Sequence, residues 1–181
     1  MLWMLFCAGV AIADDSYVHT FTGFTFPSKV GAFTKVKVTP FNAAHSDIEV
    51  DYNNDPFTVH LSVYVYPAHG PLKDHFEQCK EAVTTHTPGA KFLEEKPMTL
   101  DKSGVKYDGY YALFSFRAKF VDQLDQDLLS QVILFQRGDY YVLFRISYAA
   151  SDKVNAEAQI TDFIDKLAWP AGDGSVPKGS S

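Results

Sequence analysis

Residues 132–148 read VILFQRGDYYVLFRISY, two runs rich in β-branched and aromatic residues that meet at Gly138-Asp139. A Gly-Asp pair between two such runs is typical of a β-hairpin with a two-residue turn. With these two residues in the turn the register of the strands is fixed, because side chains alternate between the two faces of a strand. The facing pairs on one side are then Arg137 with Tyr140, Phe135 with Val142, and Ile133 with Phe144.

The two faces of this hairpin differ in composition. The face just described is largely apolar, so we expect it to form the core and to be covered by helices. The other face is mixed, and we expect it to be partly exposed to solvent. Its facing pairs are Gln136 with Tyr141, Leu134 with Leu143, and Val132 with Arg145.

Further strands and two helices are predicted around the hairpin. Alternating apolar residues predict strands at 33–38, 47–52, 57–66, 91–95 and 107–120. In the first of these strands, Val36 and Val38 are expected to point inward. Apolar residues at helical spacing predict helices at 71–85 and 152–167. The acidic segment 121–129 is expected to be a connecting loop.

The order of these elements indicates the fold class. Strands, a helix, more strands and a last helix, with hairpins joining most strands, predict an α+β fold. In such a fold an antiparallel β-sheet carries the helices packed on it as a layered sandwich. We expect both helices on the same side of this sheet, the side of the apolar hairpin face.

Length and charge limit the possible functions. The chain has 181 residues, of which 46% are hydrophobic, so it can bury one good core, and we expect a single domain over residues 14–170. The formal net charge is -6. Binding to a phosphate backbone needs a basic stripe, and the sequence contains none. We therefore expect no nucleic-acid partner.

The N-terminal residues indicate export. Residues 1–13 form an apolar run that ends in Ala11-Ile12-Ala13, directly before Asp14-Asp15. This small-x-small ending is typical of a secretory signal peptide, although no Lys or Arg precedes the apolar part. A buried N-terminal segment is the alternative. A run of this length is too short to cross about 30 Å of hydrocarbon as a helix, so no transmembrane anchor is expected after cleavage.

An exported chain would be periplasmic or secreted. Cleavage would leave Cys79 as its only cysteine, so no intramolecular disulfide is expected. The tail 171–181 is rich in Gly and Ser and is expected to be disordered.

Several local patterns resemble those of a known group of proteins. They are Phe26-Pro27 followed by Gly31 to Phe33, Tyr66-Pro67 at a strand end, HFEQCK at 75–80, the aromatic hairpin, and Leu-Ala-Trp-Pro at 167–170. These patterns resemble a family of exported bacterial proteins, and the element order is similar to the PsbP-like and DcrB-like α/β sandwich superfamily. Members of that superfamily are mostly binding or accessory subunits. The resemblance implies a noncatalytic binding or accessory protein of the bacterial cell envelope, without a cofactor, and it carries over no catalytic residue.

The candidate ligand-binding residues come from the mixed sheet face. If the strands that carry them are neighbours, cationic and aromatic side chains would gather there and suit an anionic small ligand or an acidic loop of a protein partner. An ordinary solvated face is the alternative interpretation. The residues assigned to this site are Arg117, Lys119, Tyr141, Arg145, His60 and Tyr64.

A metal site is the basis of a second hypothesis. His75 and Cys79 are at positions i and i+4 of the predicted helix, so one turn could present both to a soft metal such as zinc. His60, His69 or His86 would have to complete the site. The corresponding function is a metal-assisted hydrolase that uses His75 and neighbouring residues. Against this hypothesis, Cys79 falls on the apolar stripe of the helix, and the paired ligand spacings of structural zinc sites are absent from the sequence. The sequence leaves the oligomeric state open.

Overall fold

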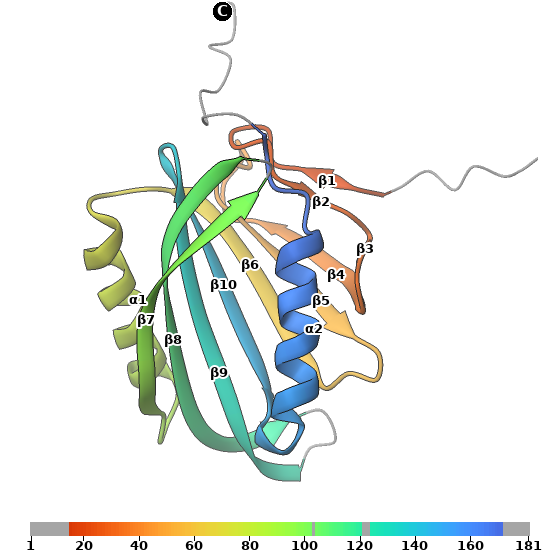
Figure 1. Ribbon diagram of the computed structural model, residues 1–181, viewed down its shortest axis with the longest axis vertical. Helices are drawn as coiled ribbons and strands as arrows, with labels where there is room; N and C mark the ends of the chain where they lie inside the picture. The colour runs from red at the N-terminus through yellow and green to blue at the C-terminus, as the bar shows by residue number, and fades with distance from the viewer. Residues whose placement is uncertain (1–14, 103, 121–123, 172–181) are drawn as a thin grey trace, which may run out of the picture.

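The computed structural model describes residues 15–102, 104–120 and 124–171 (Figure 1). These residues form one large antiparallel sheet, a small two-stranded sheet, and two α-helices. The small sheet pairs β1 (Tyr17–Val18) with β2 (Thr25–Phe26). In spatial order, the large sheet contains β3 (Lys29–Val30), β4 (Phe33–Pro40), β5 (Ile48–Asn54), β6 (Val59–Pro67), β10 (Tyr140–Ala149), β9 (Leu124–Arg137), β8 (Val105–Phe120) and β7 (Lys91–Lys102).

The hairpin predicted at residues 132–148 is confirmed as the end of β9 and the start of β10. Its register is the one that the alternation predicts, with Phe135 opposite Val142 and Val132 opposite Arg145. Gly138 has a φ of 55°, a conformation that glycine adopts without steric cost and that the first position of a type II′ turn requires. The sequence therefore predicts the central pair of strands correctly.

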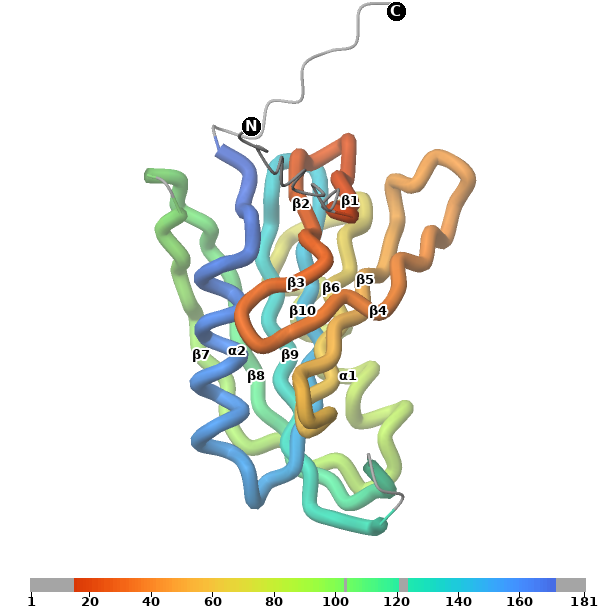
Figure 2. Tube along the Cα trace, turned by 90° about the vertical axis from the view of Figure 1, so that its right-hand side faces the viewer, coloured from red at the N-terminus to blue at the C-terminus, as the bar shows by residue number. Residues whose placement is uncertain are grey.

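The predicted α+β layered fold is also confirmed, but the two helices lie on opposite faces of the sheet (Figure 2). Helix α2 (Lys153–Lys166) packs with Phe135 and Phe144, whereas α1 (Leu72–His86) packs with Leu134 and Leu143. Since neighbouring residues of a strand point to opposite faces, these two sets of contacts define two sides. The expectation that both helices cover the same side is wrong. Part of the mixed hairpin face is buried beneath α1.

Two strand assignments also differ from the predictions. The acidic segment 121–129 does not form a loop throughout, because Asp125 and Asp127 pair with Lys119 and Arg117 inside the β8–β9 hairpin. In β4 a register shift between Lys35 and Lys37 turns Val36 outward, and its side chain is 60% exposed. Val36 is the extra residue of this β-bulge and has no partner on β5, so its side chain does not follow the expected alternation, whereas Val38 packs against the core as expected.

The core between α2 and the sheet contains an aromatic cluster around Trp169. The ring centroid of Trp169 lies 4.8 Å from that of Tyr107, 5.1 Å from Phe24 and 5.5 Å from Phe135. Its indole Nε1 donates a hydrogen bond to the carbonyl oxygen of Ile164, 2.8 Å away. The segment after α2 is thereby fixed against the sheet, which holds α2 in place across it.

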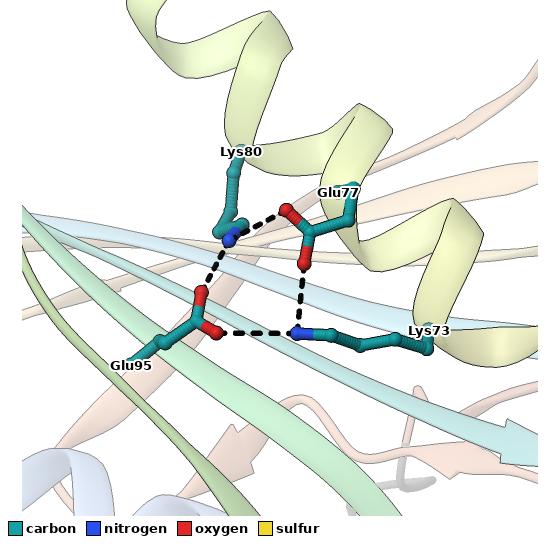
Figure 3. Close-up of polar contacts among 4 residues, drawn as sticks. All are labelled: Lys73, Glu77, Lys80 and Glu95. Atoms are coloured by element: carbon teal, nitrogen blue, oxygen red, sulfur yellow. Dashed lines mark hydrogen bonds and ion pairs between the residues drawn. The ribbon is translucent and has the colours of Figure 1, made fainter.

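Helix α1 is connected to the edge strand β7 by four charged residues (Figure 3). Lys73 lies 2.7 Å from Glu77 and 3.2 Å from Glu95, while Lys80 lies 2.7 Å from Glu77 and also pairs with Glu95. The four groups form a closed ring of alternating charge above the ring of Phe76, which Lys73 approaches to 5.0 Å. This charge ring ties α1 to β7, while the buried residues of α1 pack on β8, β9 and the near end of β10.

Some expectations fall outside the described residues. The signal peptide at 1–13 lies wholly outside them, as does all but the first residue of the tail at 171–181. Within the part of the chain that the structure describes, no helix is long and apolar enough to cross a membrane.

Candidate functional site

The candidate site is a pocket on the α1 face of the sheet, next to the area that α1 covers. Buried residues of α1 pack on β8 and β9, and the neighbouring strands β6 and β10 form the floor of a pocket of about 460 Å³. The strand register brings these residues into rows, with Ser62 opposite Arg145, Tyr64 opposite Leu143, and His60 opposite Ser147. The pocket is lined by His60, Ser62, Tyr64, Tyr66, Leu143, Arg145 and Ser147.

Arg145 is the charged group at the centre of this pocket. The titratable groups that interact with it electrostatically are Tyr64, Cys79 and Tyr66, and its burial lowers the pKa of the guanidinium. A guanidinium nevertheless stays protonated in proteins. Among the described residues no carboxylate forms an ion pair with Arg145, and its buried Nε atom has no hydrogen-bond partner. Arg145 therefore has an uncompensated positive charge.

The neighbours of Arg145 are neutral at physiological pH. Burial raises the pKa of the Tyr64 and Tyr66 hydroxyls above the ordinary value of 10.0. Burial likewise raises the pKa of the Cys79 thiol above 9.0. None of the three groups supplies a negative charge, so the guanidinium still lacks a counter-ion.

The carboxylates closest to the pocket are already engaged on the next strand, β5. Asp51 accepts a hydrogen bond from the Ser62 hydroxyl at 2.5 Å and lies 3.8 Å from the His60 ring. Glu49 interacts with the Tyr64 hydroxyl and contributes, after burial, to the raised pKa of that tyrosine. These contacts hold the rim of the pocket in shape and keep both carboxylates on the side away from Arg145.

The structure brings together three of the six residues assigned to the ligand site, namely His60, Tyr64 and Arg145. Tyr141 is adjacent but buried under α1, where its hydroxyl donates to the carbonyl oxygen of Gly70 at 2.7 Å. Arg117 and Lys119 are not part of the site. They follow Tyr111 and Leu113 on the α2 face, and Arg117 forms an ion pair with Asp127 at 3.1 Å.

The sequence analysis did not assign Ser62 and Ser147 to the site. Both lie in the described pocket, Ser62 between Asp51 and Arg145, and Ser147 opposite His60. Ser62 has the same parity as His60 in β6, and Ser147 has the same parity as Arg145 in β10. That parity was the signal in the sequence that could have assigned them to the site. It identifies the site only when the pairing of β6 with β10 is known.

His75 and Cys79, the candidate metal ligands, are engaged in other contacts. The His75 ring stacks on Tyr141 at 4.3 Å, its Nε2 lies 2.8 Å from the Tyr66 hydroxyl, and its Nδ1 lies 3.3 Å from the Gln78 side-chain oxygen. Burial lowers the pKa of His75 below 6.5. Cys79 is 7% exposed and belongs to the core under α1.

Within the described ranges, no group of three or more His, Cys, Asp and Glu side chains is arranged to hold a metal ion.

Comparison with known proteins supports the fold assignment. No protein-family model and no curated protein sequence matches this chain. The solution structure of CyanoP, the cyanobacterial PsbP of Synechocystis sp. PCC 6803, matches with a TM-score of 0.53 and 15% sequence identity, over 91% of this chain and 97% of that chain. The fold is PsbP-like.

Two further structures are similar at a lower level. A mutant of the protein Mog1 matches with a TM-score of 0.47 and 14% identity, over 84% of this chain and 94% of that chain. The Saccharomyces cerevisiae Ran-binding protein Mog1p matches with a TM-score of 0.41 and 16% identity, over 75% of this chain and 89% of that chain. At such identities the PsbP-like fold transfers no residue roles, so the site rests on the geometry around Arg145.

Proposed function

We propose that this chain is a noncatalytic binding protein that captures an anionic group, a carboxylate or a phosphate, at Arg145. The observation that carries this proposal is the uncompensated guanidinium in a pocket with hydroxyl groups. The planar guanidinium presents donors in a fork that matches both kinds of anion. The anion would belong to a small ligand or to an acidic segment of a protein partner.

The surroundings of Arg145 favour binding over catalysis. A general base needs a pKa near the working pH. The hydroxyls of Tyr64 and Tyr66 stay protonated because burial raises their pKa, so neither is a general base and neither carries a negative charge that would compete with an anion for Arg145. Ser147 adds a further hydroxyl on the β10 side of the pocket.

The cell envelope is the proposed location. It is supported by the apolar run at 1–13, which ends in Ala11-Ile12-Ala13 before two aspartates. The test is fractionation of cells that produce the chain, followed by intact-mass measurement. A species that starts at Asp14 in the exported fraction is expected. An unprocessed chain confined to the cytoplasm would contradict export without affecting the binding proposal.

The binding proposal is tested by titrating the isotopically labelled protein with inorganic phosphate and, separately, with acetate, while recording amide chemical shifts. Saturable shifts are expected on β6 and β10, around Ser62 and Arg145. Arg145→Gln should weaken binding at least about tenfold, because hydrogen bonds to charged groups are worth about 1.5–3 kcal/mol. Comparing the affinities for phosphate and acetate distinguishes a phosphate-bearing ligand from a carboxylate-bearing ligand.

Arg117→Gln is the matched control, since it removes the same charge from an exposed, paired site on the opposite face. It should leave anion binding unchanged. An equal loss of binding in both variants would indicate a nonspecific charge effect and refute the proposal. The absence of a saturable shift with either anion would also refute it.

A further inference from the structure

A second cavity lies on the opposite face of the sheet, between α2 and the β7–β8 hairpin. Figure 2 shows the edge strand β7 beside α2. Residues of both elements line a cavity of about 350 Å³. This volume falls within the range of about 300–1,000 Å³ that is usual for ligand pockets. The apolar part of its lining comes from β7, β8, β9 and α2, through Met98, Leu100, Tyr111, Ile133, Ile160 and Ile164.

The floor of this cavity contains a side-chain amide with a fixed orientation. Gln131 is 5% exposed, and its Nε2 donates to the Tyr148 hydroxyl at 2.9 Å. The Tyr148 hydroxyl donates in turn to Glu157 at 3.0 Å. Because the amide nitrogen is committed, the Gln131 oxygen is left as an acceptor, and among the described residues it has no hydrogen-bond partner.

Tyr111 supplies a donor in the same cavity. Its side chain is 9% exposed and lines the cavity, and its hydroxyl has no hydrogen-bond partner within the described part of the chain. Burial raises its pKa, with a smaller contribution from Glu94 and Glu157, so the hydroxyl keeps its proton. The floor thus offers one acceptor and one donor in apolar surroundings.

The charged residues that line this cavity are Glu94, Glu157 and Asp165 on the acidic side and Lys96 and Lys153 on the basic side. Lys153 lies 3.8 Å from Glu157, and Lys102 lies 2.7 Å from Asp165. Lys96 rests on the Tyr111 ring, with its ammonium nitrogen 4.9 Å from the ring centroid, and Glu94 of the same strand also lines the cavity. An anionic ligand would therefore meet a lining in which carboxylates outnumber ammonium groups, in contrast to the pocket at Arg145.

We propose that this cavity, the α2 groove, binds a small, uncharged and largely apolar molecule that carries an amide or hydroxyl group. The apolar body would lie between Ile160 and Ile133, and its polar group would donate to Gln131 and accept from Tyr111. The α2 groove is distinct from the anion pocket at Arg145 and lies on the other side of the sheet.

The experiment uses benzamide and 1-naphthamide as probes, with benzoate as the charged counterpart of benzamide. Titration of the labelled protein should give saturable amide shifts for at least one of the two amides, on β9 around Gln131 and on α2 around Ile160. Benzoate should bind this groove at least about tenfold more weakly, because its charge would lose hydration and meet a lining in which carboxylates outnumber ammonium groups. Failure of both amides to bind in the groove, or equal binding of benzoate there, would overturn the proposal.

Two variants test whether the amides bind in the α2 groove. Gln131→Leu removes the acceptor and should weaken amide binding about tenfold. Because that residue is buried, Thr161→Trp serves as a second variant. Thr161 is an exposed residue of α2 that lines the groove, so the larger side chain should block entry without disturbing the core.

Arg145→Gln is the control in this experiment. It should leave amide binding intact, and Thr161→Trp should leave phosphate binding intact, so failure of one site is distinguishable from failure of the other. Persistence of amide binding in Thr161→Trp would place the ligand elsewhere and refute the proposal.

Discussion

At Gly109 the backbone of β8 lies close against Leu134 and Phe135 of β9. A Cβ atom at this position would meet the Leu134 carbonyl oxygen and the Phe135 ring more closely than nonbonded atoms normally approach. Phe135 cannot easily move away, because its ring contacts both Phe144 and Trp169. The missing side chain at Gly109 is therefore a requirement of core packing.

This requirement predicts that Gly109→Ala destabilises the fold by about 1–3 kcal/mol, the usual cost of overpacking a core. The measurement is the free energy of unfolding from urea denaturation. Lys106→Ala on the same strand is the control, since Lys106 is exposed and its substitution should change stability by no more than about 0.5 kcal/mol. A Gly109→Ala variant as stable as the control would show that β8 and β9 separate without cost.

The candidate site residues show what strand alternation can and cannot predict. Parity within a strand correctly groups His60 with Tyr64, and Arg145 with Leu143. It cannot show whether Arg117 shares a face with Arg145, because that depends on the register between β8 and β9, which places Arg117 opposite Asp127. Val36 shows another limit of alternation, because it is the extra residue of a β-bulge and is exposed, although Val38 of the same parity packs against the core.

At the scale of elements, the hairpin of β9 and β10 was predictable because its turn and its alternation specify the same register. The face of the sheet on which α1 packs was not predictable in this way. The sequence analysis assumed a single covered side, whereas the buried residues of α1 pack on the face opposite to α2. Val132 and Leu134, two fully buried residues on the mixed face, were the signal that something covers that face as well.

The charge ring that connects α1 to β7 predicts a dependence on pH and salt. Contacts with Lys73 and Lys80 hold the pKa of Glu77 and Glu95 below the ordinary value of 4.5. A lowered carboxylate pKa stabilises the fold above about pH 4.5, and this stabilisation disappears as the pH falls through the lowered pKa. Because Glu95 is 37% exposed and Lys73 42% exposed, solvent screening keeps the contribution small.

Glu95→Gln should accordingly lower the free energy of unfolding by at most about 1 kcal/mol at pH 7 and low salt. The difference from the unmodified chain should shrink both in 1 M salt and below pH 4.5, where the carboxylate is screened or protonated. Glu81→Gln on the exposed side of α1 provides the comparison and should have a smaller effect at every salt concentration. A destabilisation that persists unchanged in 1 M salt would assign the effect of Glu95 to packing.

At the scale of the whole molecule, the strand order follows from one long-range pairing. β10, the last strand in the sequence, lies between β6 and β9, and it joins the strands before α1 to the strands after it. Local sequence patterns specify each hairpin, but β6 and β10 are separated by α1 and three strands, and their pairing depends on the packing of both faces together. The anion pocket depends on this pairing, and the α2 groove depends on how the β7–β8 hairpin packs next to α2. Local sequence patterns therefore could not predict either site.

The same architecture predicts how protection against amide hydrogen exchange is distributed. β10 is paired on both sides and its residues Val142 and Phe144 are fully buried, whereas β7 is an edge strand whose residues are mostly exposed. Amides open locally where few apolar contacts hold them and only by global unfolding where many do. The free energy of opening measured by exchange in β10 should therefore approach the free energy of global unfolding, and exchange in β7 should be faster and nearly independent of denaturant. Equal protection of β7 and β10 would show that the sheet opens as one unit.

Phosphate, if it binds at Arg145, should slow amide exchange in β6 without altering exchange in β7.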